Sequence, residues 1–223
     1  AYKNNKTGKY VSPSDITDLS NPKDPIDNSK LEVLFEKMSK SKYNGIDPES
    51  VIKKYGADTA RMFILFKAPP EKDLEWGDTD VEGQFRFLSR IWKLYINCAK
   101  DINSKSNSYP DKEKSLIKSM NIAIKEISND ILNNQFNTAI SELMKFYNAL
   151  SNSINDVNNN LKIEALKTFC ILLAPFAPHI SEEIWHLIGF NKSVHLEDWP
   201  SFNAEALKED SYELVIQVNG KVR

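Results

Sequence analysis

Hydrophobic spacing and helix-capping residues predict a largely helical chain from residue 47 onward. Asp47 and Pro48 suit the N-cap and the first position of a helix that ends near Tyr55, just before a glycine. Asp58 is placed to cap a second helix, which stops before the proline pair at 69–70. The sequence therefore predicts two short helices in succession.

A longer amphipathic helix begins near Asp80. Its apolar residues recur three and four positions apart and cover about half of the helix circumference. They are Val81, Phe85, Phe87, Leu88, Ile91, Trp92, Leu94, Tyr95, Cys98, Ala99 and Ile102. The opposite arc holds Arg86, Arg90, Lys93, Asn97 and Lys100. We therefore expect this helix to be buried on one side and basic on the other.

Four further helical patterns follow. They cover 116–131, 136–150, 161–174 and 178–189, and prolines at 175 and 178 separate the last two. Amphipathic helices joined by short loops pack as antiparallel bundles. The predicted fold class is mainly α: an antiparallel bundle of roughly four or five helices, preceded by a small α+β or irregular piece.

Both ends of the chain differ from this helical middle. Residues 1–35 are rich in Ser, Asn, Asp, Lys and Pro, which predicts irregular structure with short strands near 9–11 and 31–35. The final run ELVIQVNGKVR alternates as a strand does, but no sequence follows to pair with it. Because the chain also begins with Ala rather than Met, we expect a fragment of a longer protein.

Composition narrows the class of protein only slightly. The hydrophobic share of 41% and the charged share of 27% are ordinary for a globular protein. No apolar run reaches the roughly 18 residues of a membrane helix, and the polar start is unlike a signal peptide. Cys98 and Cys170 lie in apolar helical patterns, so we expect buried, reduced thiols. With a net charge of −2, any nucleic-acid binding must come from local patches.

The loop EKMSKSKYNG, residues 36–45, carries the strongest candidate chemistry. Lysine ammonium groups on flexible stems can close over a polyphosphate and neutralise charge that develops on a leaving pyrophosphate. The serines can hydrogen-bond backbone or phosphate, and Gly45 gives the loop freedom to move. Composition alone favours the plainer alternative, a solvated surface loop.

Longer sequence segments decide between a phosphate-binding loop and a solvated surface loop. KMSKS is the signature loop of class I aminoacyl-tRNA synthetases. The segments KMSKSKYNGIDPESVIKKYGADTARMFILF, DLEW with VEG, FNTAISELM, LLAPFAPHISEEIWHLIG and VNGKVR resemble leucyl-tRNA synthetases of the bacterial or organellar type, in the right order over 31–223. The resemblance implies a catalytic-domain end at 1–68, a helical bundle of the anticodon-binding type at 69–205, and the start of a further domain at 206–223.

The resemblance also implies roles for the loop residues. Lys40 would bind ATP, Lys37 would assist it, and both would stabilise the transition state for leucyl-adenylate formation. The rest of the ATP-binding set is Met38, Ser39 and Ser41. For Lys42, a solvated side chain remains an equal alternative. The implied substrates are ATP with Mg²⁺, leucine and tRNA-Leu, and the implied protein is a cytoplasmic monomer whose magnesium is held mainly by parts outside this sequence.

For the basic arc of the long helix, two interpretations stay open. Arg86, Arg90, Lys93 and Lys100 either contact tRNA phosphates or form a solvated face. For the tryptophans at 76, 92 and 185 we expect packing rather than base stacking, with Trp76 the best candidate for another role. His179 and His186 share a helix face, but no acid or cysteine completes a metal site, so we predict none.

Parts of the family pattern are absent from this sequence. The His-Ile-Gly-His string, the leucine pocket and the editing domain of the family are not found in it. We therefore predict that the chain alone makes no leucyl-adenylate. Three alternatives stay open: a stand-alone RNA-binding module, another synthetase of the same subclass, and a natural subunit of a split enzyme.

Overall fold

The computed structural model describes residues 1–101, 108–208, 217–218 and 221–222. It divides into two compact units, Ala1–Lys53 and Lys54–Arg223, and each is considered by itself. The second helix of the chain therefore belongs to the second unit, whereas the sequence grouped it with the first domain. The domain boundaries expected after residues 68 and 205 stay predictions about a longer protein.

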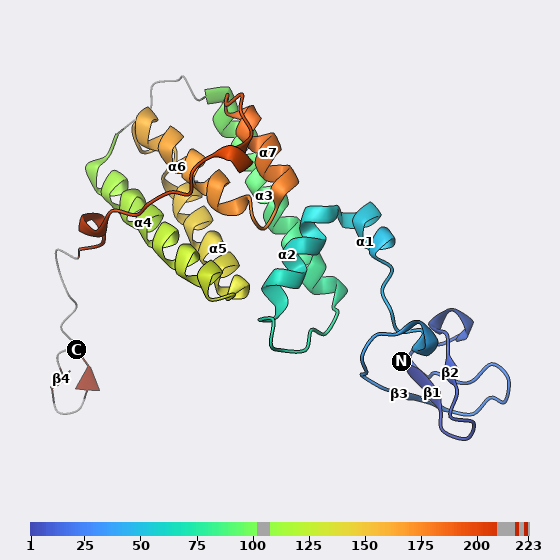
Figure 1. The fold of residues 1–223 in the computed structure, drawn as a ribbon. Helices are drawn as coiled ribbons and strands as arrows, with labels where there is room; N and C mark the ends of the chain where they lie inside the picture. Colours follow the sequence, from blue (N-terminus) through green and yellow to red (C-terminus); the bar gives the residue numbers. More distant parts are fainter. Residues whose placement is uncertain (102–107, 209–216, 219–220, 223) are drawn as a thin grey trace. The chain divides into compact units, whose positions relative to one another are not determined.

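The first unit is built on a small antiparallel sheet (Figure 1). Strand β1 (Tyr2–Asn4) lies between β2 (Tyr10–Val11) and β3 (Leu31–Val33), with Lys3 opposite Tyr10 on one side and Glu32 on the other. The 3₁₀ turns η1 (Pro13–Asp15) and η2 (Lys40–Lys42) precede helix α1 (Pro48–Tyr55). Strands β2 and β3 lie where the sequence predicts strands; the central strand β1 was missed.

Polar contacts organise this unit more than apolar packing does. Asn4 is fully buried and donates from Nδ2 to Asp24 Oδ2 at 2.6 Å. Its Oδ1 accepts from the backbone N–H groups of Lys6 and Thr7. A buried side chain with all of its groups paired fixes one arrangement of the loops around it. The hydrogen bonds of Asn4 thus hold together the loops of the first unit, which also contains residues 36–45.

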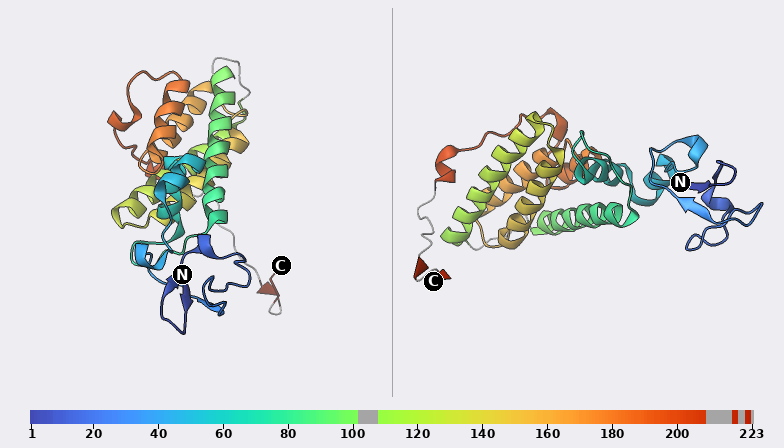
Figure 2. Two further views of the ribbon diagram at one scale, coloured as in Figure 1. Left: turned by 90° about the vertical axis from the view of Figure 1, so that its right-hand side faces the viewer. Right: turned by 90° about the horizontal axis from the view of Figure 1, so that it is seen from below.

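The second unit is an antiparallel helical bundle, and Figure 2 shows its helices from two further sides. Its helices are α2 (Ala57–Lys67), α3 (Asp78–Asp101), α4 (Pro110–Leu132), α5 (Phe136–Ser153), α6 (Asn159–Leu173) and α7 (Pro178–Leu187). The 3₁₀ turns η3 (Val194–Leu196) and η4 (Ala204–Leu207) follow. The prediction of a mainly α fold is confirmed.

One continuous hydrophobic core holds this bundle together. Phe169 of α6 lies 5.7 Å from Phe146 and 6.2 Å from Tyr147, both on α5, between ring centroids. Tyr95 of α3 is fully buried and its hydroxyl donates to the carbonyl of Leu166 at 2.6 Å. Each fully buried side chain of this kind stabilises the fold by about 1.5–3 kcal/mol.

The structure corrects three details of the predicted pattern. Phe85, assigned to the buried side of α3, is 44% exposed. Asp58 does not cap its own helix, because Gly56 occupies the N-cap position of α2. In the terminal run, the described residues form an antiparallel pair, β4 (Gln217–Val218) with β5 (Lys221–Val222), so the run supplies its own partner.

Candidate functional site

The KMSKS loop combines a short 3₁₀ turn with a left-handed residue. Ser39 is extended at the start of η2, and Tyr43 closes the turn with a φ of +51°. A bulky residue in the left-handed region is strained, so surrounding contacts must hold it there. The loop is therefore a defined structure rather than an open coil.

Asn44 supplies the contacts that close this loop. Its Oδ1 accepts from the backbone N–H of Ser39 at 2.9 Å. Its Nδ2 donates to the carbonyl oxygens of Glu36 at 3.1 Å and Lys37 at 3.4 Å. The two serine hydroxyls of the motif, on Ser39 and Ser41, lie 3.1 Å apart. One amide side chain thus ties the start of the loop to its end.

A charged cluster fixes the base of the same loop. Glu36 Oε2 accepts from the Tyr10 hydroxyl at 2.8 Å and pairs with Lys42 Nζ at 3.1 Å. The hydrogen bond from Tyr10, followed by that from Lys42, lowers the pKa of Glu36. The hydrogen bond to Glu36 in turn raises the pKa of Lys42 and that of Tyr10. Lys42 is therefore already paired within the loop, where it stabilises the loop's own structure.

The two lysines that the sequence singles out are left facing solvent. Lys37 and Lys40 are exposed, and among the described residues neither forms an ion pair or a side-chain hydrogen bond. Two ammonium groups held on a closed loop suit the binding of a polyphosphate, because their charge is not already neutralised. The donor set of this loop therefore fits ATP.

Sequence reasoning found the lysines and serines of the loop but missed the residues that shape it. Tyr10 and Glu36 lie 26 positions apart in sequence, so only the fold brings them together. Asn44 had a visible signal, since an Asn-Gly pair marks a tight turn. The roles of Lys37, Met38, Ser39, Lys40 and Ser41 in binding ATP stay predictions.

The second candidate site is the basic face of α3, defined as Arg86, Arg90, Lys93 and Lys100. All four are exposed, as the helical pattern predicts. Arg86 lies 3.9 Å from Glu82, a long and solvent-screened pair. Arg90 lies over the rings of Phe87 at 5.7 Å and Tyr147 at 5.6 Å, so it also packs on the bundle. The choice between RNA contact and a solvated face stays open on this geometry.

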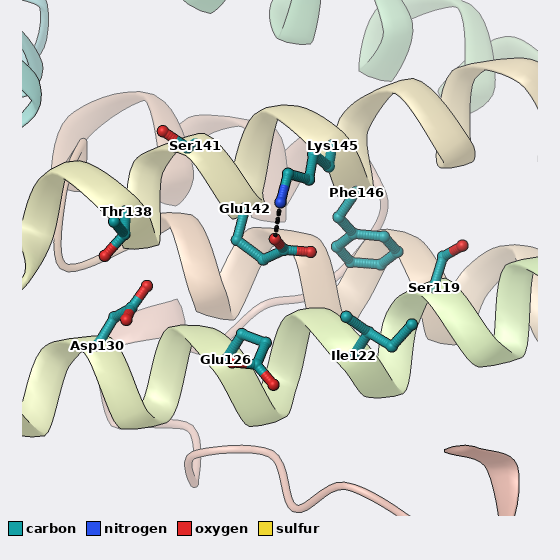
Figure 3. Close-up of a pocket in the computed structure, with 9 residues that line it drawn as sticks. All are labelled: Ser119, Ile122, Glu126, Asp130, Thr138, Ser141, Glu142, Lys145 and Phe146. Carbon is teal, nitrogen blue, oxygen red and sulfur yellow. Dashed lines mark hydrogen bonds and ion pairs between the residues drawn. The ribbon is translucent and has the colours of Figure 1, made fainter. Parts of the chain in front are cut away.

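A groove between α4 and α5 has the opposite charge. It measures about 660 Å³ and is lined by acids from both helices, Glu126 and Asp130 on α4 and Glu142 on α5 (Figure 3). Lys145 donates to Glu142 at 2.8 Å, and this contact raises the pKa of Lys145. Glu126 also pairs with Lys125 at 3.2 Å, but among the lining residues three carboxylates stand against one engaged lysine, a balance that disfavours phosphate. This groove is therefore less suited to RNA than the basic face of α3.

The tryptophans and histidines have structural partners. Trp185 is fully buried and donates to the carbonyl of Lys192, and Trp76 packs edge-on against Phe63 at 4.8 Å. Nδ1 of His179 lies 2.8 Å from Asp58, and Nε2 of His186 lies 3.1 Å from Glu182. Packing is therefore confirmed for Trp76 and Trp185.

Metal-binding clusters and membrane-spanning helices are both absent from the part of the chain that the structure describes. In these ranges, no group of three or more His, Cys, Asp or Glu side chains is arranged to hold a metal ion. Over the same residues, no helix is both long and apolar enough to cross a lipid bilayer. Cys98 and Cys170 are buried, as predicted.

Two family models match parts of the chain. The model described as the anticodon-binding domain of tRNA ligase matches residues 113–223. The model described as tRNA synthetases class I (I, L, M and V) matches residues 35–77, which include the KMSKS loop. The first match covers most of α4 and all of α5, α6 and α7, whereas the basic face of α3 lies outside both matched ranges.

The chain is similar over its full length to curated leucine–tRNA ligases. It is 96% identical to that of Prochlorococcus marinus strain AS9601, 75% to that of strain CCMP1986 and 55% to that of strain NATL1A. In each case it spans 26% of the relative's length, about a quarter of the longer protein.

One solved structure extends this similarity to the fold. It is the ternary complex of Agrobacterium radiobacter K84 AgnB2 LeuRS with tRNA and LeuAMS, with 31% identity and a TM-score of 0.73. The match covers 84% of this chain and 25% of that protein.

Proposed function

The chain belongs to the leucyl-tRNA synthetase family, and from this premise we propose that it is part of a leucine–tRNA ligase. The longer protein activates leucine with ATP and transfers it to tRNA-Leu. Within it, this chain supplies the ATP-binding KMSKS loop and the tRNA-facing helical bundle. The observation that carries the proposal is the loop itself, whose two exposed lysines stand on a structure closed by Asn44.

In the proposed first step, a carboxylate oxygen of leucine attacks the α-phosphorus of ATP. The bond from that phosphorus to the bridging oxygen breaks, and pyrophosphate leaves with the bonding electrons. Negative charge grows on the leaving group, and Lys40 with Lys37 stabilises it most when that charge is greatest. Mg²⁺ accompanies the ATP phosphates and is bound mainly by other parts of the longer protein.

In the proposed second role, the basic face of α3 contacts the phosphates of tRNA-Leu. Its cations are exposed, and the acidic groove lies between two other helices, so the α3 face can pair with phosphate where the groove cannot. Arg90 would act with less freedom than the others because it already packs on Phe87 and Tyr147. We further propose a cytoplasmic monomer.

Leucine-dependent exchange of pyrophosphate with ATP tests the first role. In the full-length enzyme, Lys40→Ala should lower kcat about 10²–10³-fold, the loss typical of a group that stabilises transition-state charge. Lys53→Ala is the matched control, because the Lys53 side chain is 75% exposed and pairs with Glu49 one turn away. An unchanged kcat in Lys40→Ala would contradict the proposal. The 223-residue chain alone should give no exchange.

A further inference from the structure

A hollow of about 540 Å³ lies in the second unit between α2, α3 and α7, three helices that Figure 1 shows side by side. Its walls are mostly apolar and aromatic. They include Tyr55, Phe85, Leu88, Trp92, Lys93 and His179. The loop chemistry does not involve this hollow, and of its walls Leu88 and Trp92 also pack against the core.

Three aromatic side chains, Tyr55, Phe85 and Trp92, line the hollow. Phe85 is 44% exposed although the helical pattern assigns it to the buried side. Its ring meets that of Tyr55 edge-on, with centroids 5.9 Å apart. Trp92, about two turns further along α3, is half-buried against the core. Ligand-binding hollows are lined mainly by apolar and aromatic side chains with a few polar groups, and this hollow has that lining.

The acids near the hollow are already engaged. Both oxygens of Asp58 accept hydrogen bonds from α7, from the N–H of Ile180 at 2.7 Å and of His179 at 3.4 Å. Glu82 accepts from the Tyr55 hydroxyl at 3.2 Å and faces Arg86. Neither carboxylate is therefore free to attract a cation into the hollow.

The cations at the rim favour an anionic ligand instead. Lys93 is exposed and lines the hollow, and it also belongs to the basic face of α3. Lys54 lies over the ring of Tyr55, which lines the hollow, at 4.7 Å. The hollow is thus an aromatic surface with a positive rim, continuous with a basic helix face. That combination suits a base and its phosphate, since bases stack on aromatic rings while phosphates pair with lysine.

We propose that this hollow binds one unpaired nucleotide of tRNA. The base stacks on Phe85 beside Tyr55 and Trp92, and its phosphate lies at Lys93. Only an unpaired nucleotide fits, because paired bases in an A-form helix do not expose their faces. The inference rests on the proposed function, which brings tRNA to this face, and it goes further by assigning a stacking site that the basic residues alone do not require.

The test uses the purified chain and a fluorescently labelled tRNA-Leu transcript, with binding followed by anisotropy at two salt concentrations. Phe85→Ala should weaken binding roughly tenfold without changing the salt dependence, because stacking releases no counterions. Phe85→Tyr should restore the affinity. Lys93→Ala should weaken binding and also flatten the salt dependence. The matched control is Leu132→Ala, an 81% exposed apolar residue at the end of α4.

Each other outcome has a distinct meaning. If the wild-type chain binds tRNA-Leu and Phe85→Ala binds equally well, the stacking site is refuted while the proposed function stands. If the folded wild-type chain binds no tRNA, the stacking site and the proposed contact of the basic face with tRNA are both refuted. A third outcome also refutes the site: in the full-length enzyme, Phe85→Ala lowers thermal stability but leaves tRNA affinity unchanged. The hollow would then be a surface covered by another part of the longer protein.

Discussion

Asp58 of α2 should stabilise the bundle by capping a different helix, α7. Ala177 is the N-cap residue of α7 and offers no side-chain acceptor. The Asp58 carboxylate takes that role from α2: Oδ2 accepts from Ile180 N and Oδ1 from His179 N. Only 8% of Asp58 is exposed, so water cannot readily replace it. Asp58→Ala should therefore leave the first turn of α7 without its acceptor.

The magnitude follows from these two hydrogen bonds; the further contact of Asp58 with the His179 ring, which is 75% exposed and open to water, is left out of it. Loss of an N-cap acceptor costs about 1 kcal/mol, and hydrogen bonds to a charged group contribute about 1.5–3 kcal/mol. The two values overlap because they describe the same bonds, and one of the two bonds is long. We expect the free energy of unfolding to fall by about 2 kcal/mol in Asp58→Ala. Asp58→Asn keeps one acceptor oxygen and should lose about 1 kcal/mol.

Urea denaturation followed by tryptophan fluorescence measures this effect. All four tryptophans lie in the second unit, so the signal reports the bundle. Glu183→Ala is the control, because it removes an exposed carboxylate from α7 itself and should change stability by less than about 0.5 kcal/mol. A loss below about 0.5 kcal/mol in Asp58→Ala would refute the capping role.

Three further predictions concern the loop, a histidine and a buried thiol. In the full-length enzyme, Asn44→Ala should raise the KM for ATP in pyrophosphate exchange several-fold, because the loop loses the side chain that closes it; an unchanged KM would contradict this. The hydrogen bond to the Phe190 carbonyl, together with that to Glu182, raises the pKa of His186 in the folded chain. The stability that protonated His186 contributes is therefore complete below the unfolded pKa near 6.5, and it is lost as the pH rises through the higher folded pKa. His186→Gln should therefore destabilise the chain more at about pH 5.5 than at about pH 8.5 in urea titrations, and an equal loss at both would exclude the linkage. Burial raises the pKa of Cys170, so iodoacetamide should modify this thiol at about pH 8 only after unfolding, as followed by mass spectrometry; modification of the folded chain would contradict its burial.

Helix positions could be predicted because local patterns determine them. The observed α1 has the predicted limits, and α3, α5, α6 and α7 begin within two residues of the predicted starts, whereas α4 begins at Pro110, six residues before its predicted pattern. The basic side of α3 was also predictable, since cations recur three and four positions apart along much of it. Its apolar side was predicted less well: Phe85 lies at the edge of the arc, where only neighbouring helices decide burial.

Contacts between distant segments were outside the reach of sequence reasoning. Asp58 has the form of an N-cap residue, and it does cap a helix, but one whose bonded N–H groups lie 121 and 122 positions further along the chain. The Tyr10–Glu36–Lys42 cluster depends in the same way on the small sheet of the first unit. Recognition of the KMSKS string identified the lysines of the candidate site, while its supporting residues required the structure.

Binding of tRNA by the purified chain tests the central claim most directly. The measurement compares tRNA-Leu with an unrelated tRNA at low and moderate salt, for the wild type and for a variant in which Arg86, Arg90, Lys93 and Lys100 are all replaced by Ala. We predict salt-sensitive binding that prefers tRNA-Leu, with a log–log salt slope that flattens in the variant by about 0.7–0.9 for each phosphate that it no longer neutralises. A folded wild-type chain that binds neither tRNA, or a variant that binds as the wild type does, would contradict the claim.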